Sequence, residues 1–267
     1  MRLGAVAADV DRTLTNDDLV LDLDAVRVIR LLEGAGVPVI LCSGRDVIAL
    51  GALAQYLGTS GVIVAEDGAI LGRFGPTHYR TRLLARPERV HAALAVLEEA
   101  FPSQLEVIQV PSRLASFVLS RVLDRAAANR LLAEKGIKAK VVDSSLTFEL
   151  ADGEVDKGSG LVEAAAMLGV DPADVVAVGD SPTDVDMFRV AGWSAAVANA
   201  PPEVKAEADY VCTLPHGQGF VEAVRRAVEL FRPDLAGLPW PEPGQEAAAG
   251  RCGPRRGTAA VGGAGGR

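Results

Sequence analysis

One short stretch near the start of the chain constrains the fold more than any other. The apolar run from Leu3 to Ala8 is typical of a strand that is buried on both faces. It is followed at once by Asp9-Val10-Asp11-Arg12-Thr13, which brings in two carboxylates and a hydroxyl. Parallel α/β sheets bind their ligands just beyond the carboxyl ends of the strands. We therefore expect Asp9 and Asp11 at the mouth of a cleft.

The stretch alone leaves two interpretations of these acids open. If the strand continued, Asp9 and Asp11 would point the same way and their charges would repel each other. A cation between them would relieve that repulsion, and oxygen ligands suit Mg²⁺. The same residues could instead form an Asp-rich turn that caps the following segment.

The composition narrows the class of protein. The 267 residues are 49% hydrophobic and 23% charged, which is typical of a soluble globular protein. The net charge of −8 argues against a general nucleic-acid or membrane-surface binder. Three scattered cysteines fit a reducing compartment, and we see neither a signal-peptide pattern nor an apolar run of roughly 20 residues. We expect a cytoplasmic protein, monomer or homodimer, without a nucleic-acid or membrane partner.

Apolar runs alternate with helical patterns in the first and last parts of the chain. The predicted strands are Leu3–Ala8, Val37–Cys42, Gly61–Ala65, Val175–Val178, Ser194–Ala198 and Ala208–Cys212. The predicted helices are Leu23–Glu33, Asp46–Leu57, Ser159–Leu168, Asp184–Ala191 and Gly219–Phe231. Strands and helices that alternate with short connections predict a parallel sheet with right-handed crossovers. We expect a Rossmann-like α/β core made of residues 1–83 and 152–232.

A different pattern occupies residues 84–151. Two helical segments, Pro87–Ala100 and Asp124–Lys135, are each followed by two strand-like segments. The predicted strands are Leu105–Val110, Leu114–Ser120, Ile137–Val142 and Leu146–Leu150. Short links favour antiparallel pairing, so we predict an αββαββ cap inserted into the core. Residues 233–267 are rich in Pro, Gly and Ala without periodicity, which predicts a disordered tail.

Polar residues follow three of the core strands and open one helix. They are Asp9, Asp11 and Thr13 after the first strand, Ser43 after the second, Asp180 and Asp184 after the fourth, and Lys157 at the helix start. Parallel strands bring their carboxyl ends to one edge, so these residues can converge. The acids could hold Mg²⁺, while hydroxyls, lysine and helix N-terminal amides could hold a phosphoryl group. A carboxylate that attacks the phosphorus would form an aspartyl-phosphate intermediate.

These residues carry a family resemblance. The segments that resemble, in order, the four motifs of haloacid dehalogenase superfamily phosphatases are Asp9-Val10-Asp11-Arg12-Thr13, Ser43-Gly44-Arg45, Lys157-Gly158 and Gly179-Asp180-Ser181-Pro182-Thr183-Asp184. The insertion resembles the small type of C2 cap in that superfamily. Among its members, the chain is most similar to archaeal-type phosphoglycolate phosphatases and related sugar-phosphate phosphatases. The resemblance implies a Mg²⁺-dependent phosphatase for a small phosphorylated metabolite, with 2-phosphoglycolate as the first candidate and a sugar phosphate as the alternative.

The resemblance also implies roles for individual residues. Asp9 would be the nucleophile and Asp11 the general acid/base. The residues that would bind the substrate phosphate are Thr13, Ser43, Gly44, Lys157 and Asn199. The Mg²⁺ ligands would be Asp9, the main-chain carbonyl of Asp11, Asp180, and Asp184 as a ligand or supporting partner.

The chain departs from the family pattern at three positions. Arg12 stands where many relatives have glycine, and Thr183 and Asp67 stand where asparagine is common. None of these changes removes a reacting group. Two other functions remain as alternatives, a signalling receiver domain and a non-catalytic phosphate-binding protein. Receivers, however, are about half this length and lack a cap.

Positive charge in the predicted cap and its approaches could contact a second anionic group on the substrate. The arginines in question are Arg80, Arg82, Arg113 and Arg121. Exposure to solvent on the surface is the commoner role of such side chains.

Overall fold

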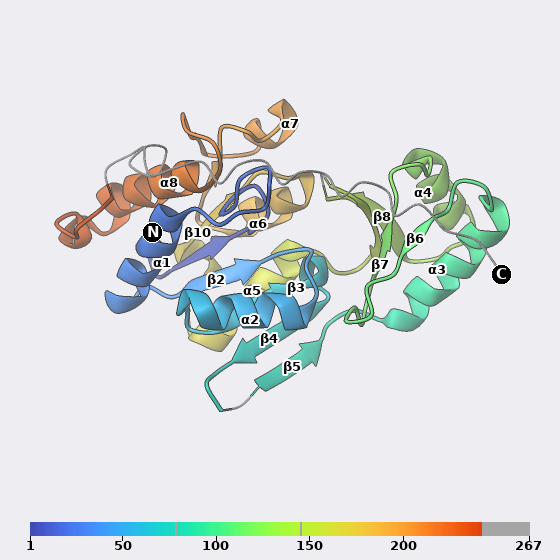
Figure 1. Cartoon of the computed structure of the whole chain (residues 1–267), viewed down its shortest axis with the longest axis horizontal. Helices are drawn as coiled ribbons and strands as arrows, with labels where there is room; N and C mark the ends of the chain where they lie inside the picture. The colour runs from blue at the N-terminus through green and yellow to red at the C-terminus, as the bar shows by residue number, and fades with distance from the viewer. Residues whose placement is uncertain (78, 145, 242–267) are drawn as a thin grey trace, which may run out of the picture.

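The structure is a computed structural model that describes residues 1–77, 79–144 and 146–241. Figure 1 shows two parts beside each other, a large sheet with helices on both faces and a smaller sheet with two helices. The predicted fold class, an α/β parallel core with an inserted α+β unit, is confirmed. In the described part of the chain, no helix combines the length and the apolar composition that a bilayer crossing requires.

The large sheet has eight strands in the order β12-β11-β10-β1-β2-β3-β4-β5. Its parallel strands are β1 (Ala5–Ala8), β2 (Val39–Cys42), β3 (Val62–Ala65), β10 (Val175–Gly179), β11 (Trp193–Ala196) and β12 (Tyr210–Val211). Strand β1 lies between β10 and β2, and Ala7 is in register with Ala177 on one side and Ile40 on the other. All four residues of β1 are buried, as the apolar run predicts.

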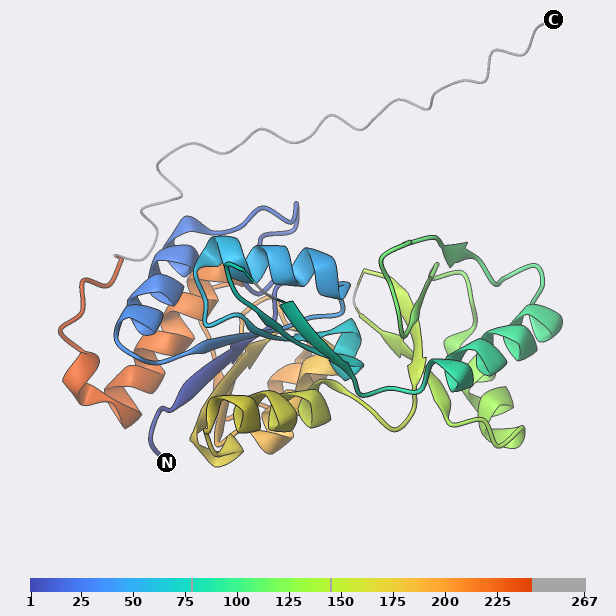
Figure 2. The same ribbon diagram turned by 90° about the horizontal axis from the view of Figure 1, so that it is seen from below.

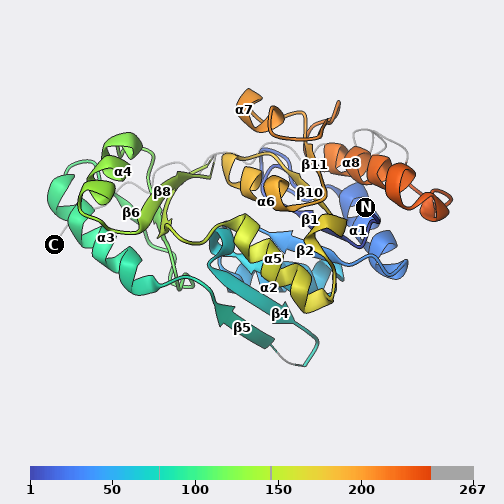
Figure 3. The same cartoon turned by 180° about the vertical axis from the view of Figure 1, so that it is seen from behind.

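Two helical layers cover this sheet. One face carries α1 (Leu23–Gly34), α2 (Val47–Leu57) and α8 (His216–Phe231), and the other carries α5 (Lys157–Leu168), α6 (Val185–Val190) and the short α7 (Pro202–Lys205). Figure 3 shows α5 and α6 in front of the sheet. Asp22, Asp46 and Asp156 accept main-chain hydrogen bonds as the N-caps of α1, α2 and α5.

The sheet extends beyond the predicted strands. Strands β4 (Ile70–Phe74) and β5 (Tyr79–Leu83) form an antiparallel hairpin at the edge next to β3. All five residues of β5 are exposed, and two of them are arginines. The sequence prediction missed this hairpin because an exposed edge strand has no buried apolar run to reveal it.

The smaller part, which we call the cap, contains an antiparallel sheet in the order β6-β7-β9-β8. Its elements are α3 (Pro87–Ala100), β6 (Val107–Ile108), β7 (Phe117–Leu119), α4 (Arg125–Glu134), β8 (Ala139–Asp143) and β9 (Phe148–Asp152). Residues from both helices and from the sheet form one apolar cluster, which includes Val90, Leu97, Leu132 and Leu150. Figure 2 shows that two chain segments join the cap to the large sheet, one after β5 and one after β9.

The segment predicted to be a disordered tail begins on the core. Residues Pro233–Leu235 form a 3₁₀ turn, and the side chains of Leu235 and Trp240 pack against the apolar core. The predicted boundary at residue 233 is therefore too early, because these two side chains bury apolar surface. Residues 242–267 lie outside the described part of the chain.

Candidate active site

Three neighbouring strands deliver the first site residues to one edge of the sheet. Asp9 directly follows β1, Ser43 follows β2 and Asp180 follows β10. The main-chain nitrogen of Asp9 donates to Val178 O at 3.0 Å, so β1 remains paired with β10 up to this point. Because β1 lies between its two neighbours, their carboxyl ends meet at this edge.

Lys157, the first residue of α5, joins two of the acids. Its Nζ donates to Asp9 Oδ1 at 2.8 Å and to Asp184 Oδ1 at 2.7 Å. Lys157 is only 2% exposed. Burial lowers the pKa of Lys157, but the charges of Asp184 and Asp9 outweigh that effect and raise the pKa, so the ammonium stays charged.

Asp184 also shapes the loop after β10. Its Oδ2 accepts hydrogen bonds from the main-chain nitrogens of Asp180 at 2.9 Å and Ser181 at 2.8 Å, and from Ser181 Oγ at 2.9 Å. These bonds hold Asp180 close to Asp184, and because β10 pairs directly with β1, Asp180 also lies close to Asp9. The loop is therefore fixed by the same carboxylate that pairs with Lys157.

Asp9, Asp180 and Asp184 can supply oxygen ligands to one metal ion. One oxygen from each lies within 4.8 Å of the others, and all three residues are buried. Burial, followed by the charge of Asp184, raises the pKa of Asp9 and raises that of Asp180 to about 7. Three buried carboxylates, two of which pair with Lys157, form a donor set that fits a hard divalent cation such as Mg²⁺.

The Asp11 side chain lies apart from this group. Arg45, in the loop after β2, donates through Nε to Asp11 Oδ2 at 2.8 Å and through Nη2 to Asp11 Oδ1 at 2.7 Å. The chain turns after Val10, whose carbonyl accepts from the nitrogen of Leu14 at 2.9 Å. The strand does not continue, so Asp9 and Asp11 contact different partners. The main-chain role that the resemblance implies for Asp11 stays a prediction.

Two of the predicted phosphate-binding side chains support the loops. Thr13 Oγ1 is buried and donates to Asp180 Oδ1 at 3.2 Å. Asn199 Nδ2 donates to Arg12 O at 3.0 Å, while Asn199 Oδ1 accepts from the main-chain nitrogen of His216 at 2.7 Å. Neither Thr13 nor Asn199 is among the described residues that line the cavity below. Arg12 lines it and has a positive φ of 64°.

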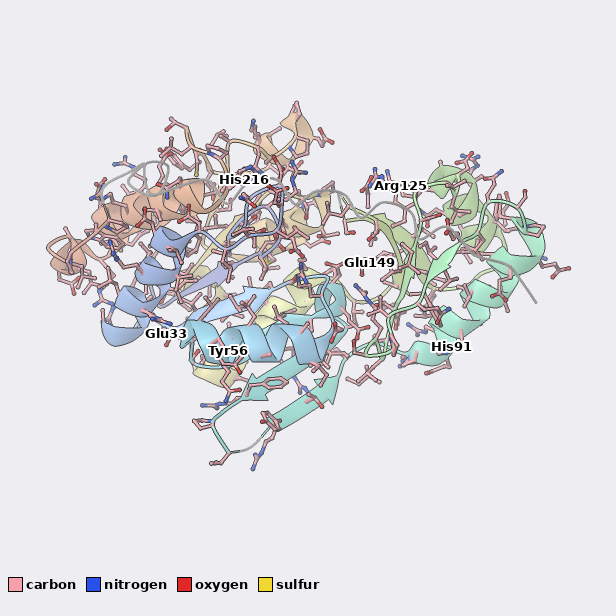
Figure 4. All side chains as sticks on the ribbon, in the orientation of Figure 1. Glu33, Tyr56, His91, Arg125, Glu149 and His216 are labelled. Carbon is pink, nitrogen blue, oxygen red and sulfur yellow. The ribbon has the colours of Figure 1, made fainter. Side chains whose placement is uncertain are left out.

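A cavity of about 160 Å³ lies between this edge of the sheet and the cap. Its lining from the core includes Asp9, Asp11, Ser43, Gly44, Lys157 and Asp180. Its lining from the cap is Arg113, Val118, Ser144, Leu146, Thr147 and Glu149. In Figure 4, Glu149 lies on the side of the cap that faces the core. The cavity therefore has a core wall and a cap wall.

A loop of the core holds the cap wall in place. The carboxylate of Glu66, just after β3, is buried and accepts from the nitrogens of Leu114 and Ala115, both at 2.9 Å, and from Ser116 Oγ at 2.8 Å. Glu66 and the next residue, Asp67, both have positive φ angles, 49° and 50°. Such angles are uncommon outside glycine and often occur at functional sites.

The sequence prediction missed the roles of Glu66 and Glu149. Their partners lie far along the chain, with separations of 48 to 50 residues for Glu66 and 36 for the Arg113–Glu149 pair. No local pattern in the sequence reports such contacts. The sequence pointed only weakly to Arg113 and Asp67. Arg113 was one of four arginines that could contact a second anionic group, and Asp67 stands where asparagine is common.

A parallel sheet with buried acids and a lysine at its carboxyl edge, under a small α+β cap, defines a capped hydrolase of the α/β class. The chain belongs to the haloacid dehalogenase-like hydrolase family, which it matches over residues 6–110 and 121–224. The predicted recognition as a phosphatase of this superfamily is confirmed, and the chain is an enzyme rather than a signalling receiver.

Curated relatives are similar to this chain over most of its length. A phosphoglycolate phosphatase of Methanoculleus marisnigri is 34% identical over 84% of this chain and 96% of its own length. A phosphoglycolate phosphatase of Archaeoglobus fulgidus is 35% identical over 83% of this chain and 95% of its own length.

Solved structures share the fold. A Thermoplasma acidophilum protein superposes with a TM-score of 0.72 at 24% identity, covering 88% of this chain and all of its own. A haloacid dehalogenase-like hydrolase from Bacillus subtilis gives a TM-score of 0.68 at 18% identity, covering 86% of this chain and 99% of its own.

Proposed function

We propose that the chain is a Mg²⁺-dependent phosphatase that hydrolyses a small phosphorylated metabolite through an aspartyl-phosphate at Asp9. The observation that carries this proposal is the buried Asp9–Lys157–Asp184 cluster, of which Asp9 and Lys157 line the cavity between the core and the cap. 2-Phosphoglycolate is the first candidate substrate. It is supported by the similarity to phosphoglycolate phosphatases at 34% and 35% identity and by the small volume of the cavity, about 160 Å³.

In the proposed first step, a carboxylate oxygen of Asp9 attacks the phosphorus, and the bond from phosphorus to the leaving-group oxygen breaks. Lys157 holds Asp9 in place and balances the negative charge that the carboxylate and the phosphoryl group share. Ser43 and Gly44 line the same wall and would contact the phosphoryl oxygens. The core residues thus bind and orient the group that is transferred.

Asp11 serves as the general acid/base in this proposal. It lines the cavity and would give a proton to the leaving-group oxygen in the first step. In the second step it would take a proton from the water that attacks the phosphorus, which releases inorganic phosphate and restores the Asp9 carboxylate. The two hydrogen bonds from Arg45 fix the position of the Asp11 carboxyl group before the substrate binds.

A bound Mg²⁺ would be held by Asp9, Asp180 and Asp184, and would supply positive charge for the phosphoryl oxygens. Thr13 and Asn199 both donate to Asp180, so they would keep that ligand in position. This indirect support is the role that the geometry favours for the two side chains.

A sugar phosphate is the second candidate substrate. Asp67 and Glu149 line the cavity, and their carboxyl oxygens could accept hydrogen bonds from the hydroxyl groups of a sugar. The chemistry at Asp9 would be the same. Only the group that leaves would differ.

The proposal is tested by assaying the purified protein with p-nitrophenyl phosphate and with a panel of phosphorylated metabolites. We expect turnover that needs Mg²⁺, stops with a chelator and returns when Mg²⁺ is added back. Turnover that continues in excess EDTA after dialysis would refute the metal requirement. A protein that releases no phosphate from any of these compounds would refute the function.

A further inference from the structure

The four arginines that could contact a second anionic group lie at different places in the structure. Arg80 and Arg82 lie on the exposed edge strand β5. Arg121 pairs with Asp143 at the surface of the cap. Arg113 lines the cavity, opposite the wall that carries Asp9. Arg113 is therefore the member of this set that can reach a bound substrate.

The Arg113 side chain is held in a fixed position. It is 9% exposed, its Nη1 donates to Glu149 Oε2 at 2.7 Å, and its Nη2 donates to Glu149 Oε1 at 3.1 Å and to Gly44 O. Its buried Nε has no hydrogen-bond partner among the described residues. Buried polar groups rarely lack a partner, and an unpaired donor beside a cavity suggests that a ligand supplies the acceptor.

The charge on Arg113 is only partly neutralised by Glu149. The Glu149 carboxyl faces Asp67 across Gly44, and a Cβ built on Gly44 would lie 2.7 Å from Glu149 Oε1 and 3.3 Å from Asp67 Oδ2. Burial, and then the charge of Asp67, raise the pKa of Glu149 to about 8, although Arg113 opposes this shift. Near neutral pH, Glu149 is therefore mostly protonated and can donate to Asp67.

We propose that Arg113 binds a carboxylate on the leaving group of the substrate, through the buried Nε that has no partner among the described residues and from the cap wall of the cavity. The inference rests on the proposed phosphatase function and names the residue that would give it a preference for acidic leaving groups. Glu66 is a positioning residue in this arrangement, because it holds the loop that follows Arg113.

The Glu149–Asp67 pair makes the binding of a carboxylate by Arg113 depend on pH. The charged groups around Glu149 are Asp67, Arg113, Glu66 beside Arg113, and Lys157, whose Nζ lies 3.7 Å from Asp67 Oδ1. When the pH rises through about 8, Glu149 loses its proton, neutralises Arg113 and adds negative charge to the cap wall. Binding of a carboxylate should therefore weaken above that pH, while binding of an uncharged group should change little.

The test compares 2-phosphoglycolate with 2-hydroxyethyl phosphate, which has an uncharged hydroxymethyl group in place of the carboxylate. The quantity measured is the ratio of their kcat/KM values, in which effects on the phosphoryl chemistry cancel. We expect Arg113→Gln to lower this ratio by about 10- to 100-fold, mainly by raising KM for 2-phosphoglycolate, as for loss of a hydrogen bond to a charged group. The matched control is Arg121→Gln, which removes another ion-paired arginine of the cap and should leave the ratio unchanged.

Two further measurements do not depend on the folding of Arg113→Gln. In the wild type, the ratio should fall as the pH rises through about 8, and Glu149→Gln, which resembles the protonated acid, should flatten that fall. A ratio that is constant with pH in the wild type, or equal losses for both compounds in Arg113→Gln, would overturn the inference. If the wild type prefers 2-hydroxyethyl phosphate, Arg113 does not bind a carboxylate of the substrate. The proposed phosphatase function would still hold in that case. If neither compound nor p-nitrophenyl phosphate is hydrolysed, the proposed function itself fails.

Discussion

At the scale of single residues, Lys157 balances the negative charge of the buried acids. It pairs with Asp9 at 2.8 Å and with Asp184 at 2.7 Å, and all three side chains are buried. The attraction between such charges offsets the loss of their hydration only while both signs are present. Substitution of the lysine would leave two carboxylates facing each other without a cation.

We predict that Lys157→Met lowers the free energy of unfolding by about 3–5 kcal/mol in metal-free buffer, the usual effect of removing one partner of a buried ion pair. Mg²⁺ should restore part of this loss, because a cation held by the same acids binds the folded state. Thermal unfolding with and without Mg²⁺ measures both effects. Lys138→Met is the matched control, because Lys138 pairs with Glu154 at the exposed surface, where a pair contributes at most about 1 kcal/mol. Equal losses in the two variants would contradict the prediction.

The sequence could predict which residues meet at this edge but not which atoms pair. Asp9, Ser43 and Asp180 each follow a buried parallel strand directly, so the sheet alone brings them together. The pairing of Asp11 with Arg45 was not predicted, because it depends on where the chain turns after β1. The contact of Arg113 with Glu149 depends on how the cap packs against the core, which no spacing in the sequence encodes.

Helix α5 shows how an element places the lysine. A Cβ on Gly158, the residue after Lys157, would lie 2.3 Å from the main-chain oxygen of Asp186. Helices α5 and α6 therefore approach so closely at this point that only glycine fits. This contact fixes the start of α5 and, with it, the position of the Lys157 side chain.

We predict that Gly158→Ala destabilises the protein by about 1–3 kcal/mol, as expected for overpacking. It should also lower kcat, since α5 must shift and Lys157 moves with it. Gly34→Ala is the control at the end of α1, where a Cβ would meet no atom within 4 Å. Steady-state kinetics and thermal melts of the two variants decide the matter. A Gly158→Ala protein with wild-type kcat would show that the close helix contact does not position the lysine.

The helices and strands that could be predicted from the sequence are the buried ones. Buried elements such as β1, β2, β10, α1 and α8 have apolar runs or helical apolar spacing that the sequence displays. The β4–β5 hairpin lacks that signal because its outer strand is exposed. The 3₁₀ turn that carries Glu66 is held by contacts with the cap, so it too could not be predicted.

In the described part of the molecule, the large sheet and the cap lie beside each other (Figure 2). The cavity that holds the candidate site lies between them. Residues 233–241 add a further contact on the far side of the sheet from the cap, where Trp240 packs against the core. This contact is remote from the cavity lining. It should therefore support stability without affecting the chemistry.

We predict that Trp240→Ala lowers the free energy of unfolding by about 1–3 kcal/mol, the value of partly burying a large apolar side chain. The kcat and KM values should not change. Leu230→Ala serves as the control, because Leu230 is 46% exposed on α8. A Trp240→Ala protein as stable as the wild type would show that the segment after α8 does not stabilise the core.

The central claim of this account is that the phosphoryl group is transferred to Asp9. Its most direct test uses Asp11→Asn with p-nitrophenyl phosphate, because nitrophenolate leaves without needing a proton whereas the second step needs a base. We predict a rapid release of one nitrophenolate per enzyme and, after acid quench, one phosphoryl group on the peptide that contains Asp9. The double variant Asp9→Asn/Asp11→Asn should show neither. A phosphoryl group on another residue, or a burst that survives the loss of Asp9, would contradict the account.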